Sequence, residues 1–195
     1  MNNEAIRRAA DLIGNADALL VAAGAGMGID SGLPDFRGPG GFWAAYPALG
    51  RRGLEFHRVA SPRTFETDPA LAWGFYGHRL NLYRATEPHA GFTVLRGWGE
   101  RMLYGYGAFT SNVDGHFQRA GFGTKNMAEC HGSIHHLQCS VPCGTAIWPA
   151  DEFTPVVDSE NCLLVSEPPR CPRCGALARP NILMFGDGAW EGARS

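Results

Sequence analysis

The segment from Ala22 to Gly38 combines residues that can bind phosphate with residues that can do chemistry. It reads AAGAGMGIDSGLPDFRG and follows the short apolar run 18–21. An apolar strand that breaks into a glycine-rich turn brings backbone N–H groups close to a phosphate. Asp35, Phe36 and Arg37 follow on the same loop. This order predicts a site in which a bound nucleotide is acted on as well as held.

The glycine spacing departs from the dinucleotide fingerprint G-x-G-x-x-G. Counted from Gly24, the motif needs glycine where Ile29 stands, and counted from Gly26 it needs glycine where Ser31 stands. A hydride-transferring Rossmann site is therefore disfavoured. A glycine cluster by itself also fits a tight strand-to-helix turn that binds nothing.

A second group of polar residues follows the predicted strand 106–110. Ser111, Asn112 and Asp114 stand in the next turn, at the carboxyl edge of a sheet, where open α/β sheets bind ligands. Asn and Asp side chains two apart can together hydrogen-bond a ribose or an amide. Further along, His131 is a candidate general base because imidazole titrates near neutral pH. A plain turn and a loop histidine are the alternatives.

Four of the six cysteines form two close pairs, C-x3-C and C-x2-C, each followed by glycine. These are Cys139, Cys143, Cys171 and Cys174. Four thiolates in this pattern make a closed tetrahedral zinc site, which folds a segment that has little core of its own. Four unrelated thiols are the alternative, with His135 and His136 as rival ligands. Cys130 and Cys162 are expected to pack as small apolar residues.

Periodicity, prolines and glycines place these residues on an α/β framework. Helices are predicted over 3–14, 69–84 and 89–98. Strands are predicted over 18–23, 106–110, 162–165 and 182–185. Ser61-Pro62 and Asp68-Pro69 each indicate an N-cap followed by proline at the first helical position. The cysteine pairs fall within 132–181, which we expect to form a small insert whose ends rejoin the main sheet.

Composition excludes several classes of protein. The chain has 195 residues, of which 45% are hydrophobic, so it can form one domain with a small insert. A net charge of −2 and a single lysine, Lys125, argue against a nucleic-acid partner. There is no unbroken apolar run of about 18 residues for a membrane span, and the N-terminus lacks a signal-peptide core. We therefore expect a cytoplasmic protein, and the oligomeric state stays open.

The motifs resemble, in order, those of the sirtuins, a family of NAD-dependent protein deacylases. The first segment is similar to the family's GAG, a small residue, then SGIPDFRG, with Gly28 where the family usually has Ser. TSNVDG resembles TQNIDG, with Ser111 in place of Gln. His131 matches the catalytic His-Gly, and 179–187 resembles RPxVVxFGE. The resemblance covers nearly the whole chain.

The resemblance implies NAD and zinc as cofactors and an acylated lysine on a protein as substrate. Asn112 and Asp114 would orient the nicotinamide and its ribose, and His131 would accept the proton of a ribose hydroxyl. The products would be the free lysine, nicotinamide and O-acyl-ADP-ribose. Phe185 and Gly186 would pair with the substrate peptide. The residues expected to contact NAD are Ala23, Gly24, Ala25, Gly26, Asp35, Phe36, Arg37, Ser111, Asn112 and Asp114.

A Tyr-x-x-Arg pair bears on which acyl group is removed. Tyr76 and Arg79 are three apart in a predicted helix and therefore share a face. A phenol and a guanidinium together can bind a carboxylate, and sirtuins that remove succinyl or malonyl groups carry a similar pair. A core tyrosine beside a surface arginine is the alternative. Those sirtuins usually have Thr where this chain has Asp35.

The resemblance also implies a division of the chain. A Rossmann-like domain is expected over 1–131, with a helical insert at about 39–88, then a zinc module over 132–181 and a return strand within 182–195. Sirtuins normally continue with strands that contact the adenosine of NAD, so we expect a truncated chain with an incomplete sheet. The alternatives are an NAD glycohydrolase, a protein ADP-ribosyltransferase of the same fold, and a non-catalytic zinc-bearing fragment.

Overall fold

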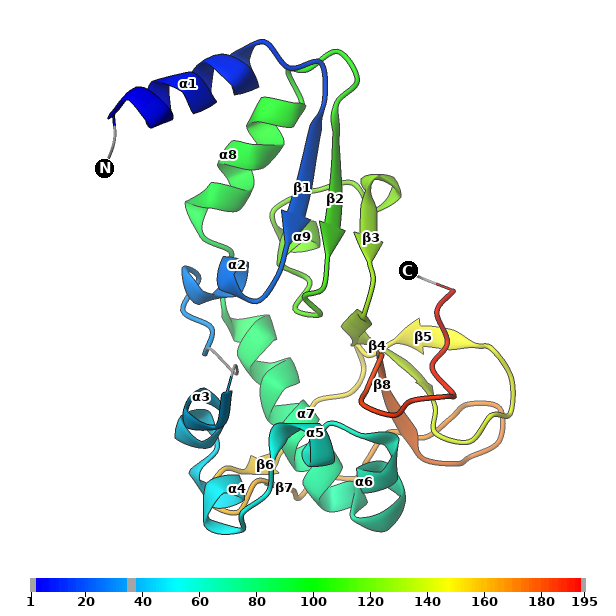
Figure 1. Ribbon diagram of the computed structural model, residues 1–195. Helices are drawn as coiled ribbons and strands as arrows, with labels where there is room; N and C mark the ends of the chain where they lie inside the picture. The colour runs from blue at the N-terminus through cyan, green and yellow to red at the C-terminus, as the bar shows by residue number, and fades with distance from the viewer. Residues whose placement is uncertain (1–2, 35–37, 194–195) are drawn as a thin grey trace.

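The computed structural model describes residues 3–34 and 38–193, with α2 to α9 following the first strand (Figure 1). The helices are α1 (Asn3–Gly14), α2 (Gly26–Ile29), α3 (Gly38–Ala45), α4 (Pro47–Arg51), α5 (Phe56–Val59), α6 (Pro62–Thr67), α7 (Pro69–Ala85), α8 (Ala90–Gly99) and α9 (His116–Arg119), with a 3-10 turn η1 (Thr124–Asn126). The strands are β1 (Leu19–Ala23), β2 (Tyr106–Thr110), β3 (Met127–Glu129), β4 (Gly132–Cys139), β5 (Ile147–Pro149), β6 (Val157–Asp158), β7 (Leu163–Leu164) and β8 (Ala178–Ile182).

Strands β1, β2 and β3 form a parallel sheet in that order. Its register pairs Leu19 with Tyr106 and Ala23 with Thr110, so β1 and β2 end side by side. Helix α8 contacts β1 and lies along one face of the sheet (Figure 1). On this sheet Leu20 and Phe109 are 75% and 50% exposed. This part of the chain has the predicted α/β character, with one helix and two strands close to their expected bounds.

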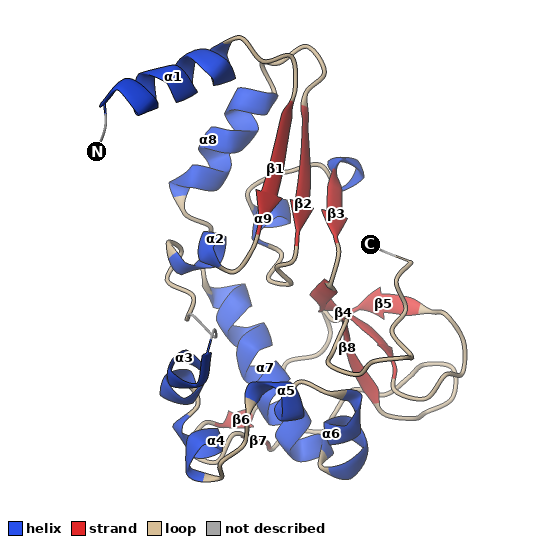
Figure 2. Cartoon of the chain, viewed as in Figure 1, coloured by secondary structure: helices blue, strands red, loops and turns tan. Residues whose placement is uncertain are grey.

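Two smaller sheets follow the parallel one. Strands β5, β4 and β8 form an antiparallel sheet, and β6 pairs with β7. Figure 2 shows helices α3 to α7 grouped together, with α7 reaching toward the parallel sheet. Helix α7 also contacts β4 of the antiparallel sheet. No helix within residues 3–34 and 38–193 is long and apolar enough to cross a membrane.

Helix α7 is the centre of the main core. Its N-cap forms as predicted, because the Asp68 carboxylate accepts a hydrogen bond from Leu71 N at 3.0 Å. Trp73 is fully buried and donates its indole N–H to the backbone oxygen of Ala178, 2.9 Å away. That bond ties α7 to β8, and it satisfies a polar group that burial would otherwise penalise.

Two expectations about local structure are corrected. The strand expected over 182–185 is instead β8, which ends at Ile182 and pairs antiparallel with β4, not with the parallel sheet. The chain leaves the sheet after Ile182, and Gly186, whose φ is +70°, lies in the turn that follows. Ser61 precedes α6 as expected, but its hydroxyl donates to the backbone oxygen of Arg58 and caps no helix N–H.

Gly74 provides a test of how closely α7 is packed. A β-carbon at this position would overlap the backbone of Cys162, and Cys162 itself has a φ of +56°. We expect Gly74→Ala to lower the free energy of unfolding by about 1 to 3 kcal/mol. Gly97→Ala in α8, where a β-carbon has room, should instead raise it by up to about 1 kcal/mol. Urea unfolding measures both, and equal effects would contradict this packing.

Candidate functional site

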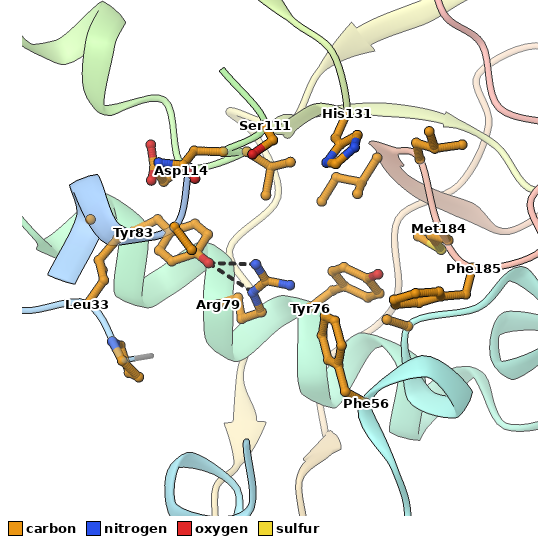
Figure 3. Close-up of a pocket in the computed structure, with 18 residues that line it drawn as sticks. Leu33, Phe56, Tyr76, Arg79, Tyr83, Ser111, Asp114, His131, Met184 and Phe185 are labelled. Atoms are coloured by element: carbon orange, nitrogen blue, oxygen red, sulfur yellow. Dashed lines mark hydrogen bonds between the residues drawn. The ribbon is translucent and has the colours of Figure 1, made fainter. Parts of the chain in front are cut away.

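A cavity of about 450 Å³ opens where the parallel sheet meets α7. Its walls come from the loop after β1, helices α5 and α7, the turn after β2, the residue before β4 and the segment after β8 (Figure 3). Because β1 and β2 are parallel neighbours, their carboxyl ends deliver two of these walls to the same edge. The cavity is therefore built from segments that are far apart in the sequence.

Hydrogen bonds join the loops that follow β1 and β2. Asn112 donates through Nδ2 to the backbone oxygen of Gly24 at 3.0 Å, and Ser111 N donates to the oxygen of Ala23 at 3.1 Å. The backbone N–H of Asn112 is held in turn by the Thr110 hydroxyl at 3.0 Å. These bonds fix the Asn112 side chain against the glycine loop, and they use up one of its two amide hydrogens.

Asp114 is a buried carboxylate at the base of the cavity, only 6% exposed. Its Oδ1 accepts the backbone N–H of His116 at 2.9 Å. Among the residues that the structure describes, none donates a hydrogen bond to Oδ2. This oxygen faces Gly28, where a β-carbon would lie 3.6 Å from it. An acceptor oxygen in this position can receive a hydroxyl or an amide from a ligand.

His131 reaches the cavity from the side opposite α7 in the view of Figure 3. The residue is exposed, so its imidazole can exchange protons with water. Its backbone oxygen accepts a hydrogen bond from Leu183 N at 3.0 Å. The next residue, Gly132, has a φ of +76°, and a β-carbon there would overlap the backbone of Asn181. The His-Gly order therefore has a steric cause as well as a chemical use.

One face of α7 lines the cavity with Tyr76, Arg79 and Tyr83 (Figure 3). Their exposed fractions are 1%, 9% and 4%. Arg79 donates from Nε and Nη2 to the Tyr83 hydroxyl, at 3.0 and 2.6 Å. Burial raises the pKa of both phenols, so they stay protonated near neutral pH. The alternative of a surface arginine is wrong, because the guanidinium is buried.

The segment after β8 presents Phe185 at the cavity. The residue is 52% exposed, and its ring packs edge-to-face on Phe56 at 5.6 Å between centroids. A buried ion pair holds the turn behind it, with Arg179 Nη1 and Nη2 donating to the two oxygens of Asp187 at 2.7 and 2.9 Å. Asp187 also accepts the backbone N–H of Met184. The pair therefore fixes the edge that Phe185 occupies.

The four paired cysteines meet in space. Their Sγ atoms all lie within 4.8 Å of one another, with Cys139 to Cys174 at 3.6 Å and Cys143 to Cys171 at 3.7 Å. Tetrahedral zinc with bonds of about 2.3 Å places its sulfurs about 3.8 Å apart. All four are free thiols. The residues present thus fit a zinc ion.

The histidines considered as rival zinc ligands are not part of this cluster. The His135 ring contacts the backbone oxygen of Asp114 through Nε2 at 2.8 Å, and burial lowers the pKa of this imidazole. Cys162 is 3% exposed, and burial raises the pKa of its thiol to about 12, as expected of an inert core cysteine. Cys130 is only partly buried.

The Sir2 family model matches residues 24–194 of this chain. The chain belongs to the Sir2 family. It is 36% identical to NAD-dependent protein deacylase 2 of Pyrobaculum aerophilum, covering 94% of this chain and 66% of that protein. It is 33% identical to NAD-dependent protein deacylase 1 of Pseudomonas aeruginosa, covering 96% and 70%. Canine mitochondrial NAD-dependent protein deacylase sirtuin-5 is 32% identical, covering 90% and 58%.

Solved structures of Sir2 proteins share the fold of this chain. A Sir2 homologue in complex with NAD superimposes with a TM-score of 0.71 at 26% identity, covering 93% of this chain and 62% of that one. An ADP-ribose complex of a Sir2 homologue gives 0.70 at 26% identity, covering 96% and 65%. The chain spans about two thirds of the length of the relatives it matches. The resemblance to sirtuins and the α/β fold with a zinc insert are thereby confirmed.

Eight of the fifteen residues predicted for catalysis, cofactor binding or substrate binding line the cavity. Those that line it are Ala25, Tyr76, Arg79, Ser111, Asn112, Asp114, His131 and Phe185. Ala23, Gly24, Gly26 and Gly186 are not among the lining residues. The backbone oxygens of Ala23 and Gly24 accept hydrogen bonds from Ser111 and Asn112, which are lining residues. Asp35, Phe36 and Arg37 lie outside the described residues.

Tyr83 is a lining residue that the sequence reasoning missed. A signal was present, because Tyr83 stands seven residues after Tyr76 and four after Arg79, the spacing of one helix face. Phe56 and Met184 were also missed. They come from a short helix and a turn, where periodicity carries no information.

Removing one partner of the ion pair behind Phe185 should be strongly destabilising. Asp187→Asn leaves the Arg179 guanidinium buried without its counter-charge, so we expect the free energy of unfolding to fall by about 3 kcal/mol. Glu87→Gln is the matched control, because its carboxylate pairs with Arg119 but is 81% exposed, and it should change stability by less than about 1 kcal/mol. Denaturant melts of both variants give the values, and similar losses would contradict the structure.

The cysteine cluster predicts about one zinc ion per chain. Cys171→Ser should lower the zinc content measured by mass spectrometry and lower the Tm, because a structural metal contributes its binding energy to folding. A chelator should have the same effect on the unmutated protein. Cys130→Ser, outside the cluster, is the control and should retain the metal. Full zinc content in Cys171→Ser would exclude this site.

Proposed function

We propose that this chain is an NAD-dependent protein lysine deacylase that releases nicotinamide and O-acyl-ADP-ribose. The observation that carries the proposal is that one cavity gathers Asn112, Asp114 and His131 beside the glycine loop. Relatives at 32 to 36% identity that are named NAD-dependent protein deacylases support it.

The residues at the carboxyl edge of the sheet fit a ribose and an amide. Oδ2 of Asp114 can accept a hydrogen bond from the ligand. Asn112 uses one amide hydrogen on Gly24, so its other amide hydrogen and its amide oxygen can bond the ligand. When bound, NAD would supply the ribose carbon that the acyl oxygen attacks while the bond to nicotinamide breaks, and one water molecule would afterwards release the free lysine. Asn112 and Asp114 hold the sugar and the amide in one orientation, which lowers the entropic part of the barrier. Asp35, Phe36 and Arg37 complete this cofactor site in our proposal.

His131 acts as the general base in this proposal. Its imidazole lines the cavity and takes a proton from a ribose hydroxyl, and its exposure lets that proton pass to water. Apolar side chains such as Val113 and Ile182 line the same cavity and limit access of water to the reacting groups. Positioning and water exclusion are then the main contributions of this chain's own residues.

The substrate peptide binds along the segment after β8 in this proposal. Leu183 and Phe185 are 39% and 52% exposed, and extended peptides commonly add to such an edge by backbone hydrogen bonds. Gly186 lies in the turn that ends this segment. The acylated lysine would reach the cavity between Phe185 and His131. Zinc at the cysteine cluster has a structural role.

We further propose that the acyl group is acidic, as in succinyl or malonyl. The Arg79 guanidinium is buried where it lines the cavity, and a carboxylate is the ligand that best offsets the cost of burying such a charge. Tyr76 lies on the same helix face, with its ring centroid 5.9 Å from Arg79 Cζ. An acetyl group offers no charge to this arginine.

The division of the chain and its location are part of the proposal. We assign 1–131, with its helical insert at about 39–88, to cofactor binding, 132–181 to the zinc module, and 182–195 to the segment that returns to the cavity. Six free cysteines favour a reducing compartment such as the cytoplasm. No nucleic acid or membrane enters the proposed reaction.

The activity is tested by nicotinamide release from NAD with and without an acyl-lysine peptide. We expect release only with the peptide, and His131→Ala should lower kcat/KM by about 100-fold or more because the general base is lost. A succinyl-lysine peptide should exceed its acetyl counterpart in kcat/KM by about tenfold or more, since a charge-assisted pair is lost with acetyl. Arg79→Met should abolish that preference.

Release of nicotinamide at an equal rate without peptide would instead indicate an NAD glycohydrolase. An acetyl preference that Arg79→Met leaves unchanged would exclude the acidic acyl group while retaining the deacylase. Absence of turnover, together with a Tm that NAD does not raise, would favour a non-catalytic zinc-bearing fragment.

A further inference from the structure

We propose that Tyr83 is a specificity-determining residue that positions the Arg79 guanidinium for the acyl carboxylate. This inference rests on the proposed acidic-acyl function. It starts from one contact, in which Nε and Nη2 of Arg79 both donate to the Tyr83 hydroxyl oxygen at 3.0 and 2.6 Å (Figure 3). One oxygen thus holds one edge of the planar guanidinium, which fixes its rotation as well as its place.

The helix makes this contact possible. Arg79 and Tyr83 are four residues apart on α7, so their side chains lie one turn apart on the same face. Arg119 fixes the C-terminal end of that helix by donating from Nη1 to the backbone oxygens of Tyr83, Arg84 and Thr86, at 3.0, 2.9 and 2.8 Å. The backbone that carries the Tyr83 side chain is therefore held in place by Arg119.

Tyr83 and an acyl carboxylate would act on the same guanidinium. Tyr83 bonds its Nε and Nη2, and a guanidinium held in a fixed orientation can bind a carboxylate with directed, charge-assisted hydrogen bonds. The Tyr83 oxygen accepts twice, and its own proton has no acceptor among the residues that the structure describes. Because Tyr83 lines the cavity, that proton is available to the ligand.

Tyr83 has this role rather than Tyr76. The ring centroid of Tyr76 lies 5.9 Å from Arg79 Cζ, and that of Tyr83 lies 5.3 Å from it. The Tyr83 hydroxyl in addition accepts two hydrogen bonds from the guanidinium. A free arginine side chain loses much rotational entropy when it binds a ligand. Holding it beforehand removes that loss from the binding step, so affinity for the carboxylate rises.

The test is peptide binding without NAD, measured by titration calorimetry on the full chain. Two peptides differ only at the acyl terminus, one with succinyl-lysine and one with the corresponding carboxamide, which has the same shape but no charge. Tyr83→Phe removes the hydroxyl and keeps the ring. We expect it to weaken succinyl binding by roughly tenfold and carboxamide binding by less than about twofold.

Three further variants separate positioning from general stability. In an Arg79→Met background, Tyr83→Phe should have no further effect, because the hydroxyl acts through the guanidinium. Arg79→Lys keeps the charge but loses the fork, so it should also lose roughly tenfold in succinyl affinity. This variant tests the idea even if Tyr83→Phe does not fold. Tyr106→Phe, whose hydroxyl bonds Gly123 N outside the cavity, is the matched control and should bind both peptides normally.

Each outcome has a defined meaning. Equal weakening of both peptides by Tyr83→Phe, or an effect that persists without Arg79, would show a structural role and overturn the inference. The inference would also be overturned if Arg79→Lys bound the succinyl peptide with the affinity of the wild-type chain. If the wild-type chain binds both peptides equally, the acidic-acyl function itself fails. The remaining outcome is that the wild-type chain prefers the succinyl peptide and that Arg79→Met removes this preference while Tyr83→Phe does not. The acidic-acyl function would then hold, and the proposed role of Tyr83 would be wrong.

Discussion

Two parallel strands that end side by side are the constraint on which the site depends. The register of β1 and β2 places Ala23 level with Thr110, so the loops that follow begin at the same height. The hydrogen bond from Asn112 to Gly24 then closes one loop on the other. Without this pairing, the glycine loop and the Asn-Asp turn would be unrelated segments, and no common cavity could form between them.

Helix α7 forms the wall of the cavity opposite the loops of the parallel sheet. Its position depends on apolar packing and on a few polar groups that are hydrogen-bonded. Trp73 bonds to β8 and Asp68 caps the first turn, while Arg119 holds the last one. A helix fixed at both ends can bury a charged side chain in a defined orientation. The burial of Arg79 is therefore a consequence of tertiary packing, and it gives the cavity a positive charge at its α7 wall.

The antiparallel sheet connects the cysteine cluster to the cavity. Strand β4 begins directly after His131 and ends at Cys139, and its neighbour β8 leads into the segment that carries Phe185. His135, midway along β4, contacts the backbone oxygen of Asp114. A metal bound at the far end of β4 would thus hold together the strands that carry the histidine and the peptide edge.

The sequence by itself predicted those parts whose cause is local. Apolar periodicity, Asp68 before proline and the spacing of the cysteines indicated α1, α7 and the zinc site, because helix capping and ligand spacing depend on near neighbours. The order of motifs predicted the family. The expected strand over 182–185 was wrong because β8 pairs with residues of β4 that lie 39 to 50 positions away along the chain.

Only the tertiary structure decided what surrounds each side chain. It buried Arg79, placed Tyr83 against its guanidinium, and turned His135 toward Asp114 and away from the cysteines. These contacts join residues through helix packing and strand pairing, whose energies come from many atoms at once. The summed packing energy cannot be read from residue types and their spacing along the chain. Which residues line the cavity was therefore visible only in the tertiary structure.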